Sequence, residues 1–189
     1  PYTQKLLAAV PNSAKLAPAT IDQEATPLLE VKNLHTSFKQ YSGILFKKLK
    51  SQVQAVNNIS LDIHKGEILG LVGESGSGKS TFGRSVMRLV ESQSGEVLMN
   101  GEDLQSLSKA SLHSARKDFQ MIFQDPYASL NPRMTVFDTL AEPLLTHKLA
   151  TKKDLGEQVN QLMDDVGLER HFVRKYPHEF SGGQRQRIA

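Results

Sequence analysis

The sequence predicts an α/β fold, because segments with the two-residue period of strands alternate with segments that have the 3.6-residue period of helices. Apolar and polar residues alternate in residues 28–34 and 59–63, as they do in half-buried strands. Residues 67–72 (EILGLV) are a short apolar run of the buried-strand kind, and a glycine-rich turn and a helical pattern follow them. The two kinds of pattern mix along the chain, without an internal repeat.

The first part of the chain differs from the rest. Residues 2–10 have the pattern of a short apolar helix, and residues 12–27 are rich in Pro, Ala and Thr without apolar periodicity, which is typical of a linker. The strand pattern starts at residue 28. Residues 39–52, between the first two strand patterns, are polar and predict a loop.

Further elements are predicted beyond the glycine-rich turn. Residues 96–100 (EVLMN) predict a strand that ends in an Asn-Gly turn with Gly101, and residues 119–123 (FQMIF) predict another strand. Residues 135–166 predict helices, and Gly167 is placed as the C-terminal cap of the last one.

The composition fits one globular domain, since 39% of the 189 residues are hydrophobic and 23% are charged. The 23 Lys and Arg residues barely exceed the 20 Asp and Glu residues and are scattered, which argues against nucleic acid as the main ligand. The lack of cysteine excludes disulfides and thiolate metal sites, and the six histidines have no metal-ligand spacing. No apolar run approaches the ~20 residues that span a bilayer, so we expect any membrane role to depend on a partner.

The strongest motif is a P-loop between the strand pattern at residues 67–72 and a helical pattern at residues 79–90. Its glycines let backbone N–H groups converge on a phosphate at a helix N-terminus, whose dipole favours an anion. Lys79 would supply a cation to the β- and γ-phosphates, Ser80 a hydroxyl ligand for Mg²⁺, and Thr81 a contact with the α-phosphate. The motif consists of Gly73, Glu74, Ser75, Gly76, Ser77, Gly78, Lys79, Ser80 and Thr81.

A second candidate anion site precedes an arginine-rich helical pattern. Ser181 is a favourable N-cap residue, and Gly182 and Gly183 leave the first backbone amides of the helix uncovered ahead of Gln184. Taken alone, this segment fits an ordinary capped helix equally well. Together with the P-loop, it favours an anion site.

The P-loop and residues 181–184 resemble the Walker A and signature motifs of ABC ATPases, and the resemblance covers residues 28–189. It implies a P-loop NTPase fold of the ABC type, with a RecA-like core, an antiparallel β part and a helical subdomain, and it implies ATP and Mg²⁺ as ligands. Phe180 stands where Leu is usual. Gln124, after FQMIF, is similar to the Q-loop, which implies contacts with Mg²⁺, the attacking water and a membrane subunit.

The same resemblance implies an aromatic side chain that stacks on adenine after the first strand. Phe38 matches that position best, Tyr41 is the second choice, and Val56 would be a supporting contact.

The subfamily is also indicated. Residues 125–136 (DPYASLNPRMTV) and 176–189 (YPHEFSGGQRQRIA) resemble the peptide/nickel group of ABC importers, whose ATP-binding subunits power the uptake of dipeptides, oligopeptides and related cargo. The resemblance implies transmembrane permease subunits, a second ATP-binding domain and, indirectly, a periplasmic substrate-binding protein as partners, at the cytoplasmic face of the bacterial inner membrane.

Residues 1–11 resemble the C-terminal tail of the same group's ATPases, which implies a preceding ATP-binding domain fused through the linker, as in double-ATPase subunits of peptide or microcin C importers. The alternative is an unrelated amphipathic helix. The chain begins with Pro1 and stops at Ala189 within a helical pattern, so we expect a fragment that stops before the catalytic carboxylates of Walker B.

Lys79 and Gln124 are accordingly the candidate catalytic residues, through positioning and charge stabilisation, and we expect this segment alone not to turn over ATP. Two other functions stay open: a non-transport ABC-type ATPase that acts on DNA or ribosomes, and a regulatory module that binds nucleotide without turnover. The segments that resemble the peptide group and the small net charge argue against the non-transport ATPase.

Overall fold

The computed structural model describes residues 3–4, 7, 25–42, 48–125 and 129–189. The chain forms two compact units, Pro1–Ser108 and Lys109–Ala189. In the described part of the chain, no helix has the length and hydrophobicity that a membrane span requires. The helix and linker that the sequence predicts before residue 28 lie almost entirely outside the described residues.

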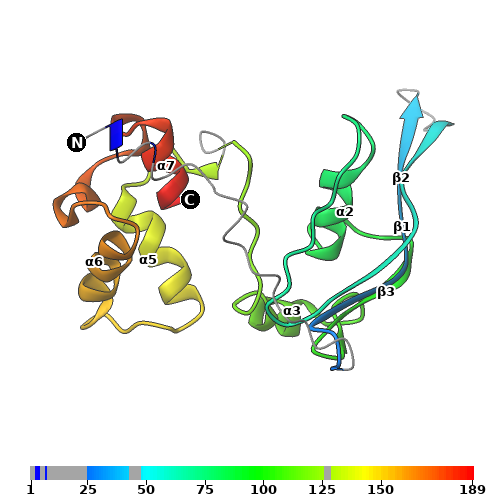
Figure 1. The fold of residues 1–189 in the computed structure, drawn as a ribbon, viewed down its shortest axis with the longest axis horizontal. Coiled ribbons are helices and arrows are strands. Elements are labelled where there is room, and N and C mark those ends of the chain that lie inside the picture. Colours follow the sequence, from blue (N-terminus) through cyan, green and yellow to red (C-terminus); the bar gives the residue numbers. More distant parts are fainter. Residues whose placement is uncertain (1–2, 5–6, 8–24, 43–47, 126–128) are drawn as a thin grey trace. The chain divides into compact units, whose positions relative to one another are not determined.

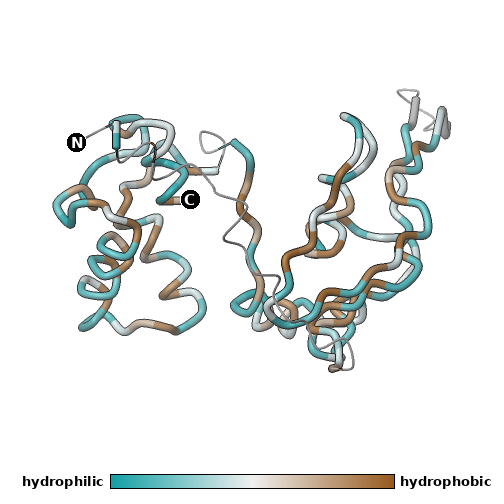
Figure 2. Tube along the Cα trace, in the orientation of Figure 1, coloured by the Kyte–Doolittle hydropathy of each residue, from teal (hydrophilic) through white to brown (hydrophobic). Residues whose placement is uncertain are grey.

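The first unit is built on an antiparallel sheet with the strand order β2-β1-β3-β4. The strands are β1 (Leu29–Ser42), β2 (Lys48–Ile63), β3 (Ser94–Met99) and β4 (Glu102–Asp103). Helix α2 (Lys79–Val86) packs against β1 and β2, on one face of the curved sheet (Figure 1). Brown, hydrophobic stretches in Figure 2 run along these strands and along α2, where the core of this unit lies.

The strands expected at residues 28–34, 59–63 and 96–100 are confirmed, but the loop expected at residues 39–52 is wrong. β1 and β2 continue through most of it as a hairpin whose last described pair is Ser42 with Lys48. Polar side chains do not prevent strand pairing where the ladder of backbone hydrogen bonds is already started, so the polarity of this segment was a misleading signal.

The turn between β3 and β4 agrees with the sequence. Asn100 has a φ of 51° and Gly101 a φ of 82°, the left-handed conformations that a two-residue hairpin turn needs at both positions.

Two predicted strands are absent from the described residues. Residues 67–72 and 119–123 are not assigned to any strand, and Ile68 and Val72 are 97% and 90% exposed. A buried strand needs hydrogen-bonded neighbours, and no described segment pairs with either run. These runs are apolar, but a strand also needs partners from elsewhere in the chain, which the runs themselves do not reveal.

The second unit is helical. It contains α3 (Lys109–Ala115), α5 (Val136–Thr146), α6 (Leu155–Asp165), the 3₁₀ helices η2 (Arg170–Arg174) and η3 (Pro177–Glu179), and α7 (Gly182–Ile188). The helices expected within residues 135–166 are thus confirmed, as α5 and α6. Thr135 caps α5 by accepting a hydrogen bond from the Asp138 N–H at 3.1 Å, and Gly167 follows α6 with a φ of 66°, as the expected terminal glycine.

The core of the helical unit joins its elements. Its buried members are Leu130, Val136, Met163, Leu168, Phe180 and Ile188. This core accommodates Phe180, which stands where Leu is usual. Phe180 is only 4% exposed, and its ring packs edge-to-face against Phe172 with ring centroids 5.7 Å apart. The expected α/β class, with an antiparallel β part and a helical part, is confirmed.

Candidate functional site

The P-loop holds its lysine against its own backbone. The Lys79 ammonium donates hydrogen bonds to the carbonyl oxygens of Gly73 at 2.6 Å and Glu74 at 2.7 Å, and a longer one to Ser77 Oγ at 3.4 Å. The loop therefore closes around the cation at the start of α2. An ammonium held by carbonyl oxygens can exchange these partners for phosphate oxygens, which are stronger acceptors because they carry charge.

Helix α2, which carries the P-loop, is fixed to the sheet by a buried polar contact. Thr36 Oγ1 of β1 and Ser85 Oγ of α2 lie 2.9 Å apart, and both residues are fully buried. Phe82 and Val86 bury the apolar side of the same helix. A satisfied hydroxyl pair in a core has few alternative arrangements, so this contact fixes the last turn of α2 against β1.

Strand β2 bulges where it passes the P-loop. Thr36 pairs with Val56, but the next residue of β1, Ser37, pairs with Gln54. Ala55 is therefore an extra residue on β2, as in a β-bulge. Bulges turn the backbone groups of the extra residue away from the ladder, and they occur often beside functional sites.

The bulge faces a glycine of the P-loop. A β-carbon built on Gly78 would lie 2.1 Å from the Ala55 carbonyl oxygen, and Gly78 has a φ of 95°. Both facts require glycine at this position. Gly76 also has a positive φ, of 81°, but nothing lies within 4 Å of a β-carbon built there.

A cavity of about 440 Å³ lies between the P-loop and β2. Its lining includes Gly73, Ser77, Gly78 and Lys79 of the P-loop, Phe82 of α2, and Gln54, Ala55, Val56 and Asn57 of β2. Sequence reasoning missed Gln54, Ala55 and Asn57, because no pattern in the sequence reveals the bulge. Val56 lines the cavity with little surface, since it is only 3% exposed.

The candidate adenine-stacking residue lies on the same strand pair. Phe38 is 44% exposed and is paired with Val53, which is 51% exposed, so the two form an open apolar surface on the hairpin. Tyr41, the second choice, lies among the residues whose side chains are not described.

The two residues expected to bind Mg²⁺ belong to different units of the chain. Ser80 is exposed at the start of α2, and its hydroxyl has no hydrogen-bond partner among the described residues, which fits an oxygen ligand for a hard cation. Gln124 is exposed and belongs to the second unit. No cluster of three or more His, Cys, Asp or Glu side chains suited to a metal is found among the described residues.

The second candidate anion site forms the start of α7 in the helical unit. Ser181 Oγ accepts a hydrogen bond from the Gln184 N–H at 3.3 Å, and Gln184 Oε1 accepts one from the Ser181 N–H at 3.0 Å. Ser181 is thus the N-cap that the sequence predicts, within a reciprocal capping box. Arg185 donates from Nε to the Phe180 carbonyl at 3.0 Å and so holds the turn before the helix. Gly182 and Gly183 leave the first backbone amides of α7 without side-chain cover.

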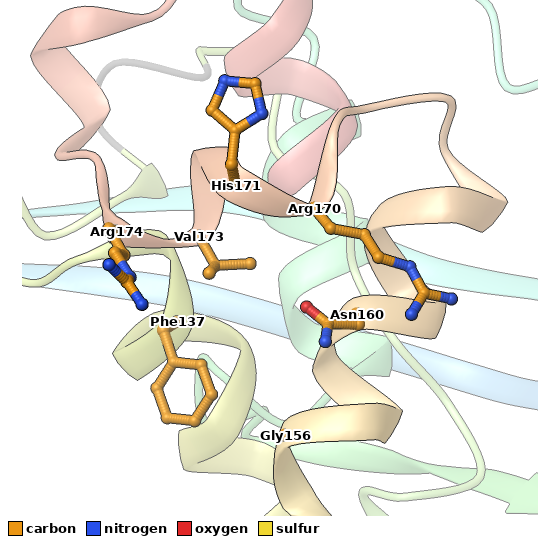
Figure 3. A pocket seen from close by; sticks show the side chains of 7 residues that line it. All are labelled: Phe137, Gly156, Asn160, Arg170, His171, Val173 and Arg174. Atoms are coloured by element: carbon orange, nitrogen blue, oxygen red, sulfur yellow. The ribbon is translucent and has the colours of Figure 1, made fainter.

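A further cavity of about 630 Å³ lies within the helical unit, between α5, α6 and η2. In Figure 3, Phe137 and Asn160 face the same space as Val173, whereas the His171 ring points away from them. Arg170, at the edge of this cavity, donates a hydrogen bond to the Asp164 carboxylate at 2.6 Å. This hydrogen bond, together with the negative charge of Asp164, raises the pKa of the guanidinium. None of the predicted site residues lines this cavity, so it is separate from the candidate site.

The protein-family model described as ABC transporter matches residues 56–189. Among curated proteins, the chain is similar to the glutathione import ATP-binding protein GsiA of Escherichia coli, with 47% identity over 212 residues, 100% of this chain and 34% of that protein. It is also similar to GsiA of Pectobacterium atrosepticum, with 45% identity over 211 residues, 100% of this chain and 34% of that protein. The chain spans about a third of the length of these relatives.

Solved structures give the same grouping. The ATP-binding cassette MJ0796, in a dimeric post-hydrolysis state bound to ADP and Pi, matches with a TM-score of 0.71 and 26% identity, over 85% of this chain and 66% of that chain. CbiO1 from Clostridium perfringens, part of the ABC transporter complex cbiONQ, matches with a TM-score of 0.66 over 87% of this chain and 59% of that chain; at 22% identity it supports the fold alone.

Proposed function

Because this chain belongs to the ABC transporter family, we propose that it is the ATP-binding and ATP-hydrolysing motor part of an importer for peptides or related cargo. The observation that carries the proposal is the cavity between the P-loop and β2, where Lys79, the glycine-rich backbone and the bulge of β2 converge. Fixed donors around a cation at a helix N-terminus suit a triphosphate.

The chemistry proposed for this site is positioning and charge stabilisation. Lys79 exchanges the carbonyls of Gly73 and Glu74 for phosphate oxygens, while Phe38 receives the base. Ser80 would offer Mg²⁺ a hydroxyl ligand and Gln124, as the family resemblance implies, an amide oxygen; a bound Mg²⁺ would supply neutralisation of charge on the phosphates. A magnesium site of this kind needs few protein ligands, because the phosphates provide the others.

Two features support peptide-like cargo. Residues 125–136 and 176–189 resemble the peptide/nickel group of importers, and the similar proteins from two bacteria are named for the import of glutathione, which is a tripeptide. These names favour transport over the alternative of an ABC-type ATPase that acts on DNA or ribosomes.

The proposal includes partners. Transmembrane permease subunits would receive the motion at the cytoplasmic face of the inner membrane, near Gln124, and a periplasmic binding protein would act through them. A second ATP-binding domain, fused upstream or separate, would contribute to the site in which residues 181–184 take part. The small excess of positive charge, +3, does not support a nucleic-acid partner.

The test is Lys79→Ala in the complete protein, with Lys65→Ala, an exposed lysine in the turn after β2, as the matched control. Loss of the charged donor should weaken ATP binding by at least about tenfold, since a hydrogen bond to a charged group contributes about 1.5–3 kcal/mol. Uptake of labelled dipeptides, oligopeptides and glutathione by cells should stop.

The control variant should bind ATP and support uptake normally. Equal ATP affinity in both variants would exclude the P-loop assignment. Normal binding without uptake of any peptide by the unaltered protein would exclude the importer role and leave the nucleotide-binding module as the better account.

A further inference from the structure

Helix α2 meets strands β1 and β2 at a contact near each of its ends. At its start, the backbone of Gly78 lies so close to the Ala55 carbonyl of β2 that no side chain fits between them. At its end, Thr36 Oγ1 of β1 lies 2.9 Å from Ser85 Oγ, and both residues are fully buried. Of these two contacts only the hydrogen bond is directional, so it restricts how α2 can rotate on the sheet.

Further polar contacts surround this hydrogen bond. Thr36 Oγ1 also lies 3.1 Å from Ser92 Oγ, in the segment that precedes β3. Gln105 donates from Nε2 to the Ser85 carbonyl oxygen at 3.2 Å. The Thr36 hydroxyl has one proton and two lone pairs, so it can bond both serines at once. A buried polar group with its partners in place has few alternative positions, and the end of α2 is therefore held against β1.

The residue proposed to hold the base lies on the same face of β1 as Thr36. No extra residue of β1 lies between Thr36 and Phe38, because the irregularity at this point belongs to β2. Successive side chains of a strand alternate between its faces, so residues two apart share a face. Phe38 is therefore on the α2 side of the sheet, about 7 Å along the strand from Thr36.

We propose that Thr36 is a positioning residue for ATP, a role that rests on the function proposed above. A nucleotide has its base and its triphosphate on one molecule, so it gains from both subsites only where their spacing lets both ends bind at once. The hydrogen bond to Ser85 holds α2, and with it Lys79, in a fixed position relative to Phe38. Thr36 itself does not touch the nucleotide, because its side chain is fully buried.

The test removes this hydrogen bond from either side. Thr36→Val keeps the β-branched shape and loses the hydroxyl, whereas Thr36→Ser keeps the hydroxyl and loses the methyl group. Ser85→Ala removes the other partner and introduces a good helix former into α2. Ser92→Ala is the matched control, because it removes a hydroxyl beside Thr36 without cutting the contact with α2.

The experiment measures equilibrium binding of ATP and of inorganic tripolyphosphate, both with Mg²⁺, to the full chain and to each variant. Tripolyphosphate reports on the P-loop alone, so the ratio of the two affinities reports on the contribution of the base. Thr36→Val and Ser85→Ala should each lower this ratio by at least about threefold and keep tripolyphosphate affinity within about twofold, because the P-loop itself is intact. Thr36→Ser and Ser92→Ala should keep the ratio of the unaltered chain.

Combined variants test whether Thr36 acts through Phe38. Phe38→Ala should lower the ratio, and the addition of Thr36→Val should lower it no further. Thr36→Val together with Ser85→Ala should have the effect of either one alone, since both remove the same contact.

Three results would overturn this role. An unchanged ratio in Thr36→Val and Ser85→Ala, even with a lower midpoint of urea unfolding, would make the contact purely structural. A loss of tripolyphosphate affinity with an unchanged ratio would assign the contact to the P-loop alone. A further loss when Thr36→Val is added to Phe38→Ala would show that Thr36 does not act through the base. In all three cases ATP binding still depends on Lys79, whereas a failure of the proposed function appears as ATP binding that Lys79→Ala does not change.

Discussion

The carbonyl oxygen of Ala55 occupies the space beside Gly78 that a β-carbon would need, since the two would be 2.1 Å apart. This contact joins the bulge of an edge strand to the loop that is proposed to hold phosphates. The closeness of the two backbones fixes the width of the cavity between them. Glycine at residue 78 is thus needed for the fit of the loop against β2 and for its own backbone conformation.

Gly78→Ala should therefore disturb both stability and nucleotide binding. The left-handed conformation alone costs an L-residue about 1–2 kcal/mol, and the clash with the Ala55 carbonyl forces the loop to move. Gly76→Ala is the control, because it shares the positive φ but meets no atom within 4 Å. Urea unfolding and ATP titration should show a small stability loss for Gly76→Ala and a larger loss, with weakened binding, for Gly78→Ala. Equal behaviour of the two variants would mean that the contact with β2 has no role.

The open surface at Phe38 gives a prediction that separates binding from folding. Phe38→Ala should weaken ATP binding by about tenfold, since stacking on an aromatic ring contributes about 1–3 kcal/mol per base. Stability should change little, because the ring is already 44% exposed. Tyr41→Ala is the comparison and should leave ATP affinity nearly unchanged. A larger loss for Tyr41→Ala would transfer the stacking role to that residue.

Local chemistry explains which parts of this molecule could be predicted from its sequence. The cap at Ser181, the Asn100–Gly101 turn and the helix that starts at Lys79 depend on residue types within a few positions, and each follows the prediction. The apolar runs at residues 67–72 and 119–123 failed as strands, because a strand also depends on partners from elsewhere in the chain.

The parts of the candidate site that sequence reasoning missed share one cause. Gln54 and Ala55 line the cavity beside the P-loop where β2 bulges at Ala55, and a bulge depends on the register of two paired strands. Phe38 could be chosen from its place after the strand expected at residues 28–34, but its position within β1 and its exposed pairing with Val53 required the structure. Roles for these residues stay predictions until the variants are measured.

Substitutions of Phe180 test the packing beneath the second candidate anion site. Phe180→Ala should lower the free energy of unfolding by about 3–5 kcal/mol, because it empties a buried position against Phe172. Phe180→Leu should cost less than about 1.5 kcal/mol, since its shape change is small and the core can repack. Leu149→Ala, at a position 56% exposed, is the control and should have little effect in the same denaturant titration. A cost for Phe180→Leu as large as that for Phe180→Ala would show that the aromatic edge contact is essential.

The last prediction concerns Ser181, whose hydroxyl caps α7 in the reciprocal pair with Gln184. Two substitutions separate its capping role from a role in receiving phosphate. Aspartate is as good an N-cap as serine, so Ser181→Asp should keep the stability of the helical unit, whereas Ser181→Ala should lose about 1 kcal/mol. The rates of ATP hydrolysis of the two variants should rank in the opposite order to their stabilities. A carboxylate at the helix start repels a γ-phosphate, so Ser181→Asp should abolish ATP hydrolysis in the assembled transporter, while Ser181→Ala should keep part of it.

ATP binding at Lys79 should be unchanged in both Ser181 variants, because Ser181 is proposed to serve the ATP of a neighbouring domain. The measurements are urea unfolding and ATP titration of the full chain, followed by hydrolysis rates of the assembled transporter. Loss of ATP binding in Ser181→Asp at the pocket of Lys79 would mean that the two motifs act on the same nucleotide in one chain. Equal hydrolysis by the two variants would instead assign Ser181 to helix capping alone, since charge repulsion would then have no part in its effect.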